Sequence, residues 1–120
     1  MTVALDPHTG HDQWWVYDYF EGTLDIDKER YPSCGQIRDW MREAGFRDTY
    51  SCVVQHEADK VPAEVALQNG TLSPAYTSQL AVLSQDELSE GIERIEAALS
   101  KDSGMHLSAD LRIYATFASA

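Results

Sequence analysis

The sequence has few basic residues and no long apolar run. Nine Lys and Arg stand against twenty Asp and Glu, which gives a formal net charge of −11. Such a surface repels nucleic-acid phosphates and anionic lipid headgroups, so neither is expected as a partner. No stretch reaches the roughly 18 apolar residues that a membrane-spanning helix needs. The first ten residues also lack the basic and apolar segments of a signal peptide. A cytoplasmic location is therefore expected.

Cysteines and glycine-rich loops are equally scarce. Only Cys34 and Cys52 are present, as is typical of free thiols in a reducing compartment. The seven glycines are scattered, and no G-x-G or G-x-G-x-x-G motif occurs. Loops of that kind hold the phosphates of nucleotide cofactors. The sequence therefore predicts no cofactor-binding residues in this chain.

What is present favours a folded protein. Apolar residues make up 43% of the 120 residues, and three Trp, six Tyr and three Phe supply large side chains for a core. A chain of this length normally forms one domain and buries about two thirds of its extended surface. Residues 1–120 are therefore expected to form a single domain.

The clearest local pattern is a helix followed by a strand. Ser33 and Gln36 have the spacing of a capping box, in which each side chain bonds to the backbone N–H of the other residue. Gly45 suits the left-handed position that ends a helix, and Thr49–Gln55 is rich in strand-forming residues. One face of the helix is apolar and needs a sheet to cover: Ile37, Trp40, Met41 and Ala44.

The other elements are predicted from the same kinds of pattern. Strands are expected at Thr2–Leu5 and at Asp110–Ala118, where apolar and polar residues alternate. Between these strands we expect a helix over Gln13–Phe20, an irregular acidic segment over Gly22–Arg30 and a polar connection over His56–Lys60. Short helices are expected over Ala63–Gln68 and from Ser73 to Leu83. A longer helix is expected to begin at a capping box of Ser84 and Glu87 and to end near Ser100. The strands at Thr2–Leu5 and Thr49–Gln55 can lie parallel, because a helical crossover joins them. The pattern does not determine where the last strand, Asp110–Ala118, lies in the sheet.

Five segments together resemble a known family. They are VALDPHTGHDQWWVYDYF, DIDKERYPSCGQIRDWMREAGF, TYSCVVQH, TSQLAVLSQDELSEGIERIEAAL and LRIYATFA. In this order they are similar to the C-terminal half of class I S-adenosylmethionine-dependent methyltransferases of the small-molecule type (type 11 or 12). The segments resemble that family's fifth strand, last sheet helix, sixth strand, substrate-side helical cap and seventh strand.

The resemblance implies an α/β fold, or an α+β-like fragment of one. The expected sheet is mixed and three-stranded, in the order first–last–middle with the last strand antiparallel, and it is packed by helices that include the cap. The family's cofactor-binding residues belong to an N-terminal half that has no counterpart here. S-adenosylmethionine is therefore implied only if such a half is supplied, and the chain is not expected to be catalytic alone.

Candidate ligand-binding residues lie near the start of the chain. The aromatic-rich segment is placed on the substrate side by the resemblance, and His11, Trp14, Trp15 and Tyr19 are predicted to face a substrate cleft. Aromatic residues at helical spacing also commonly form core, which is the alternative interpretation. The neighbouring polar cluster of Asp6, His8, His11 and Asp12 is open to three interpretations: a metal site, a pocket lining or a solvated loop.

Two functional hypotheses follow. The chain is either the substrate-side half of a methyltransferase that needs a complementary N-terminal half, or a stand-alone small-ligand-binding or assembly protein. In both cases the first strand has an open edge that invites pairing. The expected partners are that complementary half or a second copy of the chain, joined through the edge of the first strand or through apolar helix faces.

Overall fold

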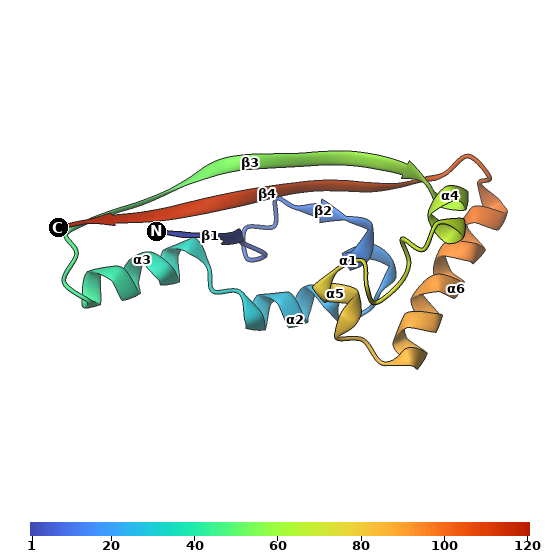
Figure 1. Ribbon diagram of the computed structural model, residues 1–120, viewed down its shortest axis with the longest axis horizontal. Coiled ribbons are helices and arrows are strands. Elements are labelled where there is room, and N and C mark those ends of the chain that lie inside the picture. The colour runs from blue at the N-terminus through green and yellow to red at the C-terminus, as the bar shows by residue number, and fades with distance from the viewer.

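Two long strands run along most of the molecule and form the main part of the sheet of an α+β fold (Figure 1). The structure, a computed structural model, describes residues 1–120. Strand β3 (Asp48–Pro62) pairs antiparallel with β4 (His106–Ser119) over nearly its whole length. On the other side of β4 lie β1 (Thr2–Leu5) and the two-residue β2 (Gln13–Trp14), both antiparallel to it.

The last strand therefore occupies the centre of the sheet, between β1 and β3. This confirms the expected order of first, last and middle strands and the antiparallel direction of the last one. The expected three-stranded mixed sheet is wrong in two respects, because the sheet has four strands and every hydrogen-bonded pair is antiparallel. The fourth strand arises where Gln13 and Trp14 pass beside Asp110 and Ala109 of β4.

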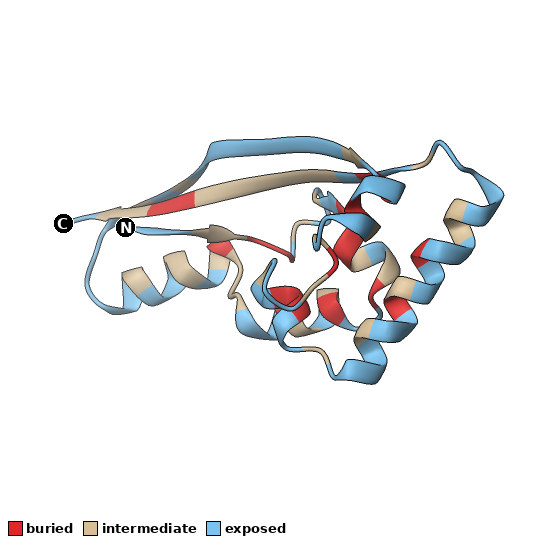
Figure 2. Ribbon diagram, turned by 45° about the vertical axis from the view of Figure 1, so that its right-hand side comes forward, coloured by how far each residue is buried: buried red, intermediate tan, exposed pale blue.

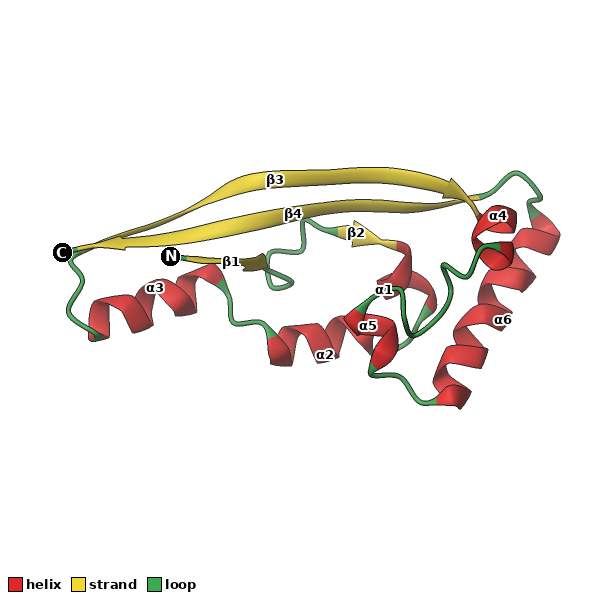
Figure 3. Ribbon diagram, in the orientation of Figure 1, coloured by secondary structure: helices red, strands yellow, loops and turns green.

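Six helices complete the fold. They are α1 (Trp15–Tyr19), α2 (Thr23–Arg30), α3 (Cys34–Glu43), α4 (Ala63–Gln68), α5 (Ser78–Ala81) and α6 (Gln85–Lys101). Helix α3 packs on β3 and β4 near the two chain termini, α2 lies below the middle of the molecule, and α1, α4, α5 and α6 lie toward the opposite end (Figure 3). None of the helices combines the length and the apolar character needed to cross a bilayer.

The helix ends predicted from capping residues agree with the structure. Ser33 accepts a hydrogen bond from the Gln36 amide at 3.1 Å, although no return bond from the Gln36 side chain is formed. Ser84 and Glu87 form the complete reciprocal box at the start of α6. Gly45 has φ of 104° just after α3, a conformation that costs glycine least.

Several boundaries expected from the sequence are wrong. Helix α1 is shorter than Gln13–Phe20, because its first two residues form β2. The segment expected to be irregular, Gly22–Arg30, contains α2, and the helix expected from Ser73 to Leu83 is reduced to α5. The polar connection expected over His56–Lys60 is part of β3.

The hydrophobic core lies at the end of the sheet far from the chain termini, where α1, α4, α5 and α6 meet (Figure 2). The pairing register places Leu107, Ala109 and Leu111 of β4 on the face toward this core. The ten buried core residues are Trp14, Trp15, Val16, Phe20, Ala63, Ala66, Leu72, Leu80, Ile95 and Leu107. The radius of gyration is 17.0 Å, whereas a compact chain of this length has about 14 Å, so the molecule is elongated.

Candidate functional site

A small polar pocket opens at the carboxyl end of β1. Its volume is about 230 Å³. The loop that follows β1 supplies five of its eight lining residues, and α1 and α2 supply the other three. The residues around it are Pro7, His8, Thr9, Gly10, Asp12, Tyr17, Leu24 and Lys28.

The buried carboxylate of Asp6 fixes the loop that forms this pocket. One of its oxygens accepts a hydrogen bond from the His8 amide and the other from the Cys34 amide, each at 3.0 Å. The second bond ties the loop to the first turn of α3, where the helix dipole favours a negative charge. His8 is held further by contact of its Nε2 with the Tyr31 carbonyl at 2.7 Å. Asp6 therefore positions the pocket without lining it.

Asp12, which lines the pocket, has one carboxylate oxygen that is buried without a hydrogen-bond partner. Its Oδ1 accepts a hydrogen bond from the Arg112 amide of β4 at 2.9 Å. Its Oδ2 is the oxygen without a partner. Burial raises the pKa of Asp12, and the bond from Arg112 offsets only part of that effect.

A buried hydrogen-bond network supports the pocket from behind. The Tyr17 hydroxyl donates to Asp27 Oδ2 at 2.6 Å, and the Gln79 side-chain amide donates to the same oxygen at 3.1 Å. Asp27 is fully buried, and Arg30 Nε lies 4.0 Å from its other oxygen. Burial, followed by the bond to Asp27, raises the pKa of Tyr17, so the phenol stays protonated at physiological pH.

The raised pKa of Asp12 predicts a pH-dependent effect of Asp12→Asn. The unfolded chain ionises this group near pH 3.9, and the folded chain at a higher pH. Ionised Asp12 therefore opposes folding above the folded pKa, and this penalty becomes small below about pH 3.9, where most molecules are protonated in both states. We expect the variant to gain stability relative to the parent as pH rises from 3.5 to 7. Urea unfolding at both values measures this, and an equal difference at the two would contradict it.

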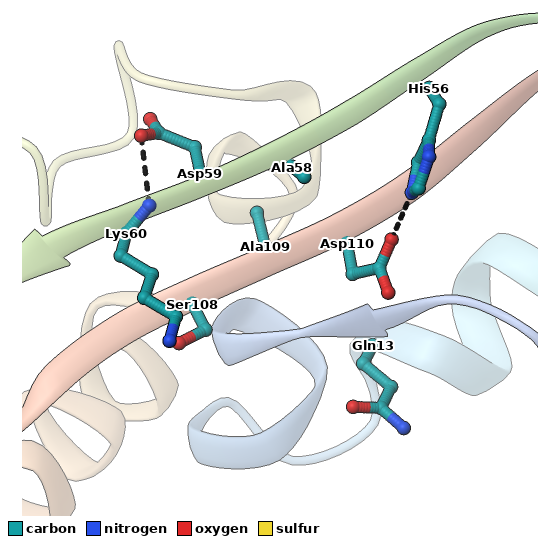
Figure 4. Close-up of a pocket in the computed structure, with 8 residues that line it drawn as sticks. All are labelled: Gln13, His56, Ala58, Asp59, Lys60, Ser108, Ala109 and Asp110. Carbon is teal, nitrogen blue, oxygen red and sulfur yellow. Dashed lines mark hydrogen bonds and ion pairs between the residues drawn. The ribbon is translucent and has the colours of Figure 1, made fainter.

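A larger and more open trough lies on β3 and β4, at the end of the sheet where the core packs against the opposite face of β4 (Figure 4). Its volume is about 630 Å³, and it is lined by Gln13, His56, Ala58, Asp59, Lys60, Ser108, Ala109 and Asp110. The trough exists because the small side chain of Ala58 lies between the long ones of His56 and Lys60 on one strand.

A His–Asp pair is the main chemical feature of the trough. His56 Nε2 bonds to Asp110 Oδ1 across β3 and β4, and this bond lowers the pKa of Asp110. Arg112 Nη1 lies 3.9 Å from the same oxygen. Ser108 lines the trough too, but no hydrogen bond joins it to His56, so the three side chains do not form a nucleophilic triad.

The structure distributes the four predicted substrate-binding residues between core and surface. Trp14 and Trp15 are buried in the core, and Tyr19 packs partly buried against it. His11 is exposed, and its carbonyl accepts a hydrogen bond from Arg112 Nη1. None of the four lines a pocket. Their role in substrate binding stays a prediction.

The polar cluster expected to be a metal site, a pocket lining or a solvated loop is divided by the fold. His8 and Asp12 line the pocket, whereas both oxygens of Asp6 are used in backbone hydrogen bonds. No group of three or more His, Cys, Asp or Glu side chains is arranged to hold a metal ion. Sequence reasoning counted Tyr17 with the aromatic residues that form either a pocket wall or core, but it did not select Tyr17, which lines the pocket, as a binding residue. It also missed the His56–Asp110 pair, whose members are 54 residues apart.

Comparison with known proteins identified no relative of this chain. No protein-family model matches the chain, and no curated protein matches it. The functional interpretation therefore depends on the strand order, the two recessed surfaces and the sequence resemblance described above.

Proposed function

We propose that this chain is the substrate-side portion of a class I S-adenosylmethionine-dependent methyltransferase-like protein, and that it acts only with a complementary cofactor-binding portion. The order β1–β4–β3, with β4 antiparallel to both neighbours, is the observation that carries the proposal. Hydrophobic periodicity left the place of the last strand open, whereas the family resemblance requires this order. The agreement supports the resemblance on a point that the local sequence pattern did not fix.

The position of the polar pocket supports the same proposal. In open α/β sheets, ligands bind beyond the carboxyl ends of the strands. The pocket lies there with respect to β1, and His8, Thr9 and Asp12 follow that strand directly. Together with Tyr17 and Lys28 they form a polar lining that suits a hydrogen-bonding substrate. In this proposal these residues bind and orient the substrate.

The complementary portion would supply what the chain lacks. It would bring a glycine-rich loop for S-adenosylmethionine, which provides the methyl group, and a strand beside β1. The edge of β1 away from β4 has no partner, since β1 pairs with β4 alone. A second copy of the chain could pair through this same edge of β1, in place of the complementary portion, and such pairing stays a prediction.

Co-purification tests the proposal. The N-terminal portion of a small-molecule methyltransferase of this class, ending after its fourth strand, is expressed with residues 1–120 of this chain. We expect a stable one-to-one complex. The same portion with its own C-terminal half is the positive control. A portion that pairs with its own half and never with this chain would overturn the proposal.

A further inference from the structure

One end of the molecule exposes an unusual amount of apolar surface. We define this arm as residues 1–5, 33–54 and 113–120, which comprise β1, α3, the first half of β3 and the second half of β4. Of the ten large apolar side chains that are exposed, seven lie on the arm: Met1, Val3, Trp40, Phe46, Tyr50, Val53 and Val54. Exposed apolar side chains that gather in one region mark interaction surfaces.

The arm has almost no core of its own. Only Cys34, Ala115 and Thr116 are buried within it, and the rest is half-buried or exposed (Figure 2). The reason is that the arm has two layers, the sheet and α3, whereas at the other end α1 and α4 pack on the sheet and α6 packs on both of these helices (Figure 3). A two-layer slab buries one face of its sheet and leaves the other face in water.

Hydrogen bonds identify the covered face. Arg38 of α3 donates to the Ser51 hydroxyl at 2.6 Å, and Ser51 contacts the Thr116 hydroxyl at 3.0 Å. Because side chains alternate along a strand, the neighbours of these residues point to the opposite face. The register places nine side chains there: Val3, Leu5, Asp48, Tyr50, Cys52, Ile113, Ala115, Phe117 and Ser119. We call this set the bare face.

The bare face carries one charged side chain, that of Asp48 at the end of β3, and it holds a stacked aromatic pair. The rings of Tyr50 and Phe117 stack with centroids 4.8 Å apart, and Tyr50 is 57% exposed. Stacked aromatic rings offer a large contact area with little conformational entropy to lose on binding.

Charge indicates which partner suits this surface. The arm contains Arg38, Arg42 and Arg47 against Asp39, Glu43 and Asp48, so its formal side-chain charge is zero. The net charge of −11 is therefore carried entirely by the rest of the chain. Two copies that meet elsewhere repel each other, whereas two arms meet without repulsion.

We propose that the bare face is the interface of a homodimer, in which two copies pack sheet against sheet about a two-fold axis. Such a contact is isologous, since each copy offers the same patch. Ideal strand spacings give this face dimensions of roughly 14 by 20 Å, smaller than the ~800 Å² per partner of a standard stable interface. A dimer that dissociates in the micromolar range is therefore expected. The edge of β1 stays free, so this inference does not depend on the proposed methyltransferase function.

Sedimentation velocity on the full chain tests the proposal with a matched pair of variants. Tyr50→Glu places a carboxylate on the bare face, whereas Tyr76→Glu places one on the other end of the molecule. The two tyrosines are 57% and 50% exposed, and each contacts another aromatic ring. From about 1 to 100 µM we expect the parent and Tyr76→Glu to dimerise, and Tyr50→Glu to have a dissociation constant raised at least about tenfold.

A second pair of variants tests the same interface in case Tyr50→Glu does not fold. Val3→Lys adds charge to the bare face, and Val82→Lys adds it to the helical end, at positions 55% and 48% exposed. Circular dichroism verifies that each variant keeps its secondary structure. A parent that sediments at the monomer mass of 13.5 kDa throughout would overturn the proposal. A dimer that survives either bare-face substitution in a folded variant would overturn it too.

Discussion

Replacement of Gly91 by alanine is expected to cost about 3 kcal/mol of stability, the upper end of the range for overpacked cores. Gly91 lies in α6 with its Cα against the fully buried ring of Phe20. A Cβ built at this position overlaps the ring, with Cγ 2.8 Å away and two further ring carbons closer still. Alanine normally gains about 1 kcal/mol over glycine in a helix, so a large loss would show that packing dominates.

Gly35 provides the matched control for this substitution. It lies in α3, and a Cβ there would meet its nearest atoms at 3.7 and 3.8 Å, which is ordinary contact. Gly35→Ala is therefore expected to be neutral or to stabilise by up to about 1 kcal/mol. Urea unfolding followed by circular dichroism measures both variants. Equal changes in the free energy of unfolding for the two substitutions would contradict the close contact between Gly91 of α6 and the Phe20 ring.

Removal of the Asp27 carboxylate is the second change with a large expected effect. Asp27→Ala leaves the Tyr17 hydroxyl and the Gln79 amide without their shared acceptor, and Arg30 without its ion-pair partner. Because Asp27 is fully buried, water does not replace these bonds without opening the structure. Loss of one member of a buried network of this kind costs about 3 kcal/mol.

Asp39 is the control for a carboxylate that pairs at the surface. It lies 2.9 Å from Arg42 in α3, but both side chains are more than half exposed. Asp39→Ala is expected to cost less than about 0.5 kcal/mol, as is usual for exposed ion pairs. Equal losses of stability in the Asp27 and Asp39 variants would contradict the buried network.

The elements that the sequence predicted well are those with local determinants. The N-terminal caps at Ser33 and Ser84, together with the stop at Gly45, agree with the structure because capping is decided within three or four residues. Strand β1 begins and ends as expected at Thr2–Leu5. The place of β4 was a non-local property, and only the family resemblance anticipated it.

The elements that the sequence missed are held by distant partners. His56–Lys60 lacks strand propensity, yet it is extended because β4 offers hydrogen bonds beside it. Its polar side chains are tolerated because this part of the edge strand is exposed on both faces. Helix α2 has no clear apolar stripe, since its fully buried residues are Thr23 and Asp27. A search for apolar periodicity therefore does not find it.

The candidate sites were predicted in the same uneven way. The sequence singled out His8 and Asp12 because they lie in one polar loop after a strand, and both line the pocket. The hydrogen-bonded pair of Tyr17 and Asp27 gave no local pattern. Asp110 was read as the first residue of a strand, so nothing indicated its bond to His56.

Calorimetric titration of S-adenosylmethionine tests the central claim most directly. The claim is that this chain provides the substrate side of a methyltransferase-like fold and takes its cofactor from a complementary portion. The account predicts no saturable heat with the chain alone, and binding at one site when the chain is combined with that portion. Saturable binding by the chain alone, or a complex that leaves the cofactor unbound, would contradict it.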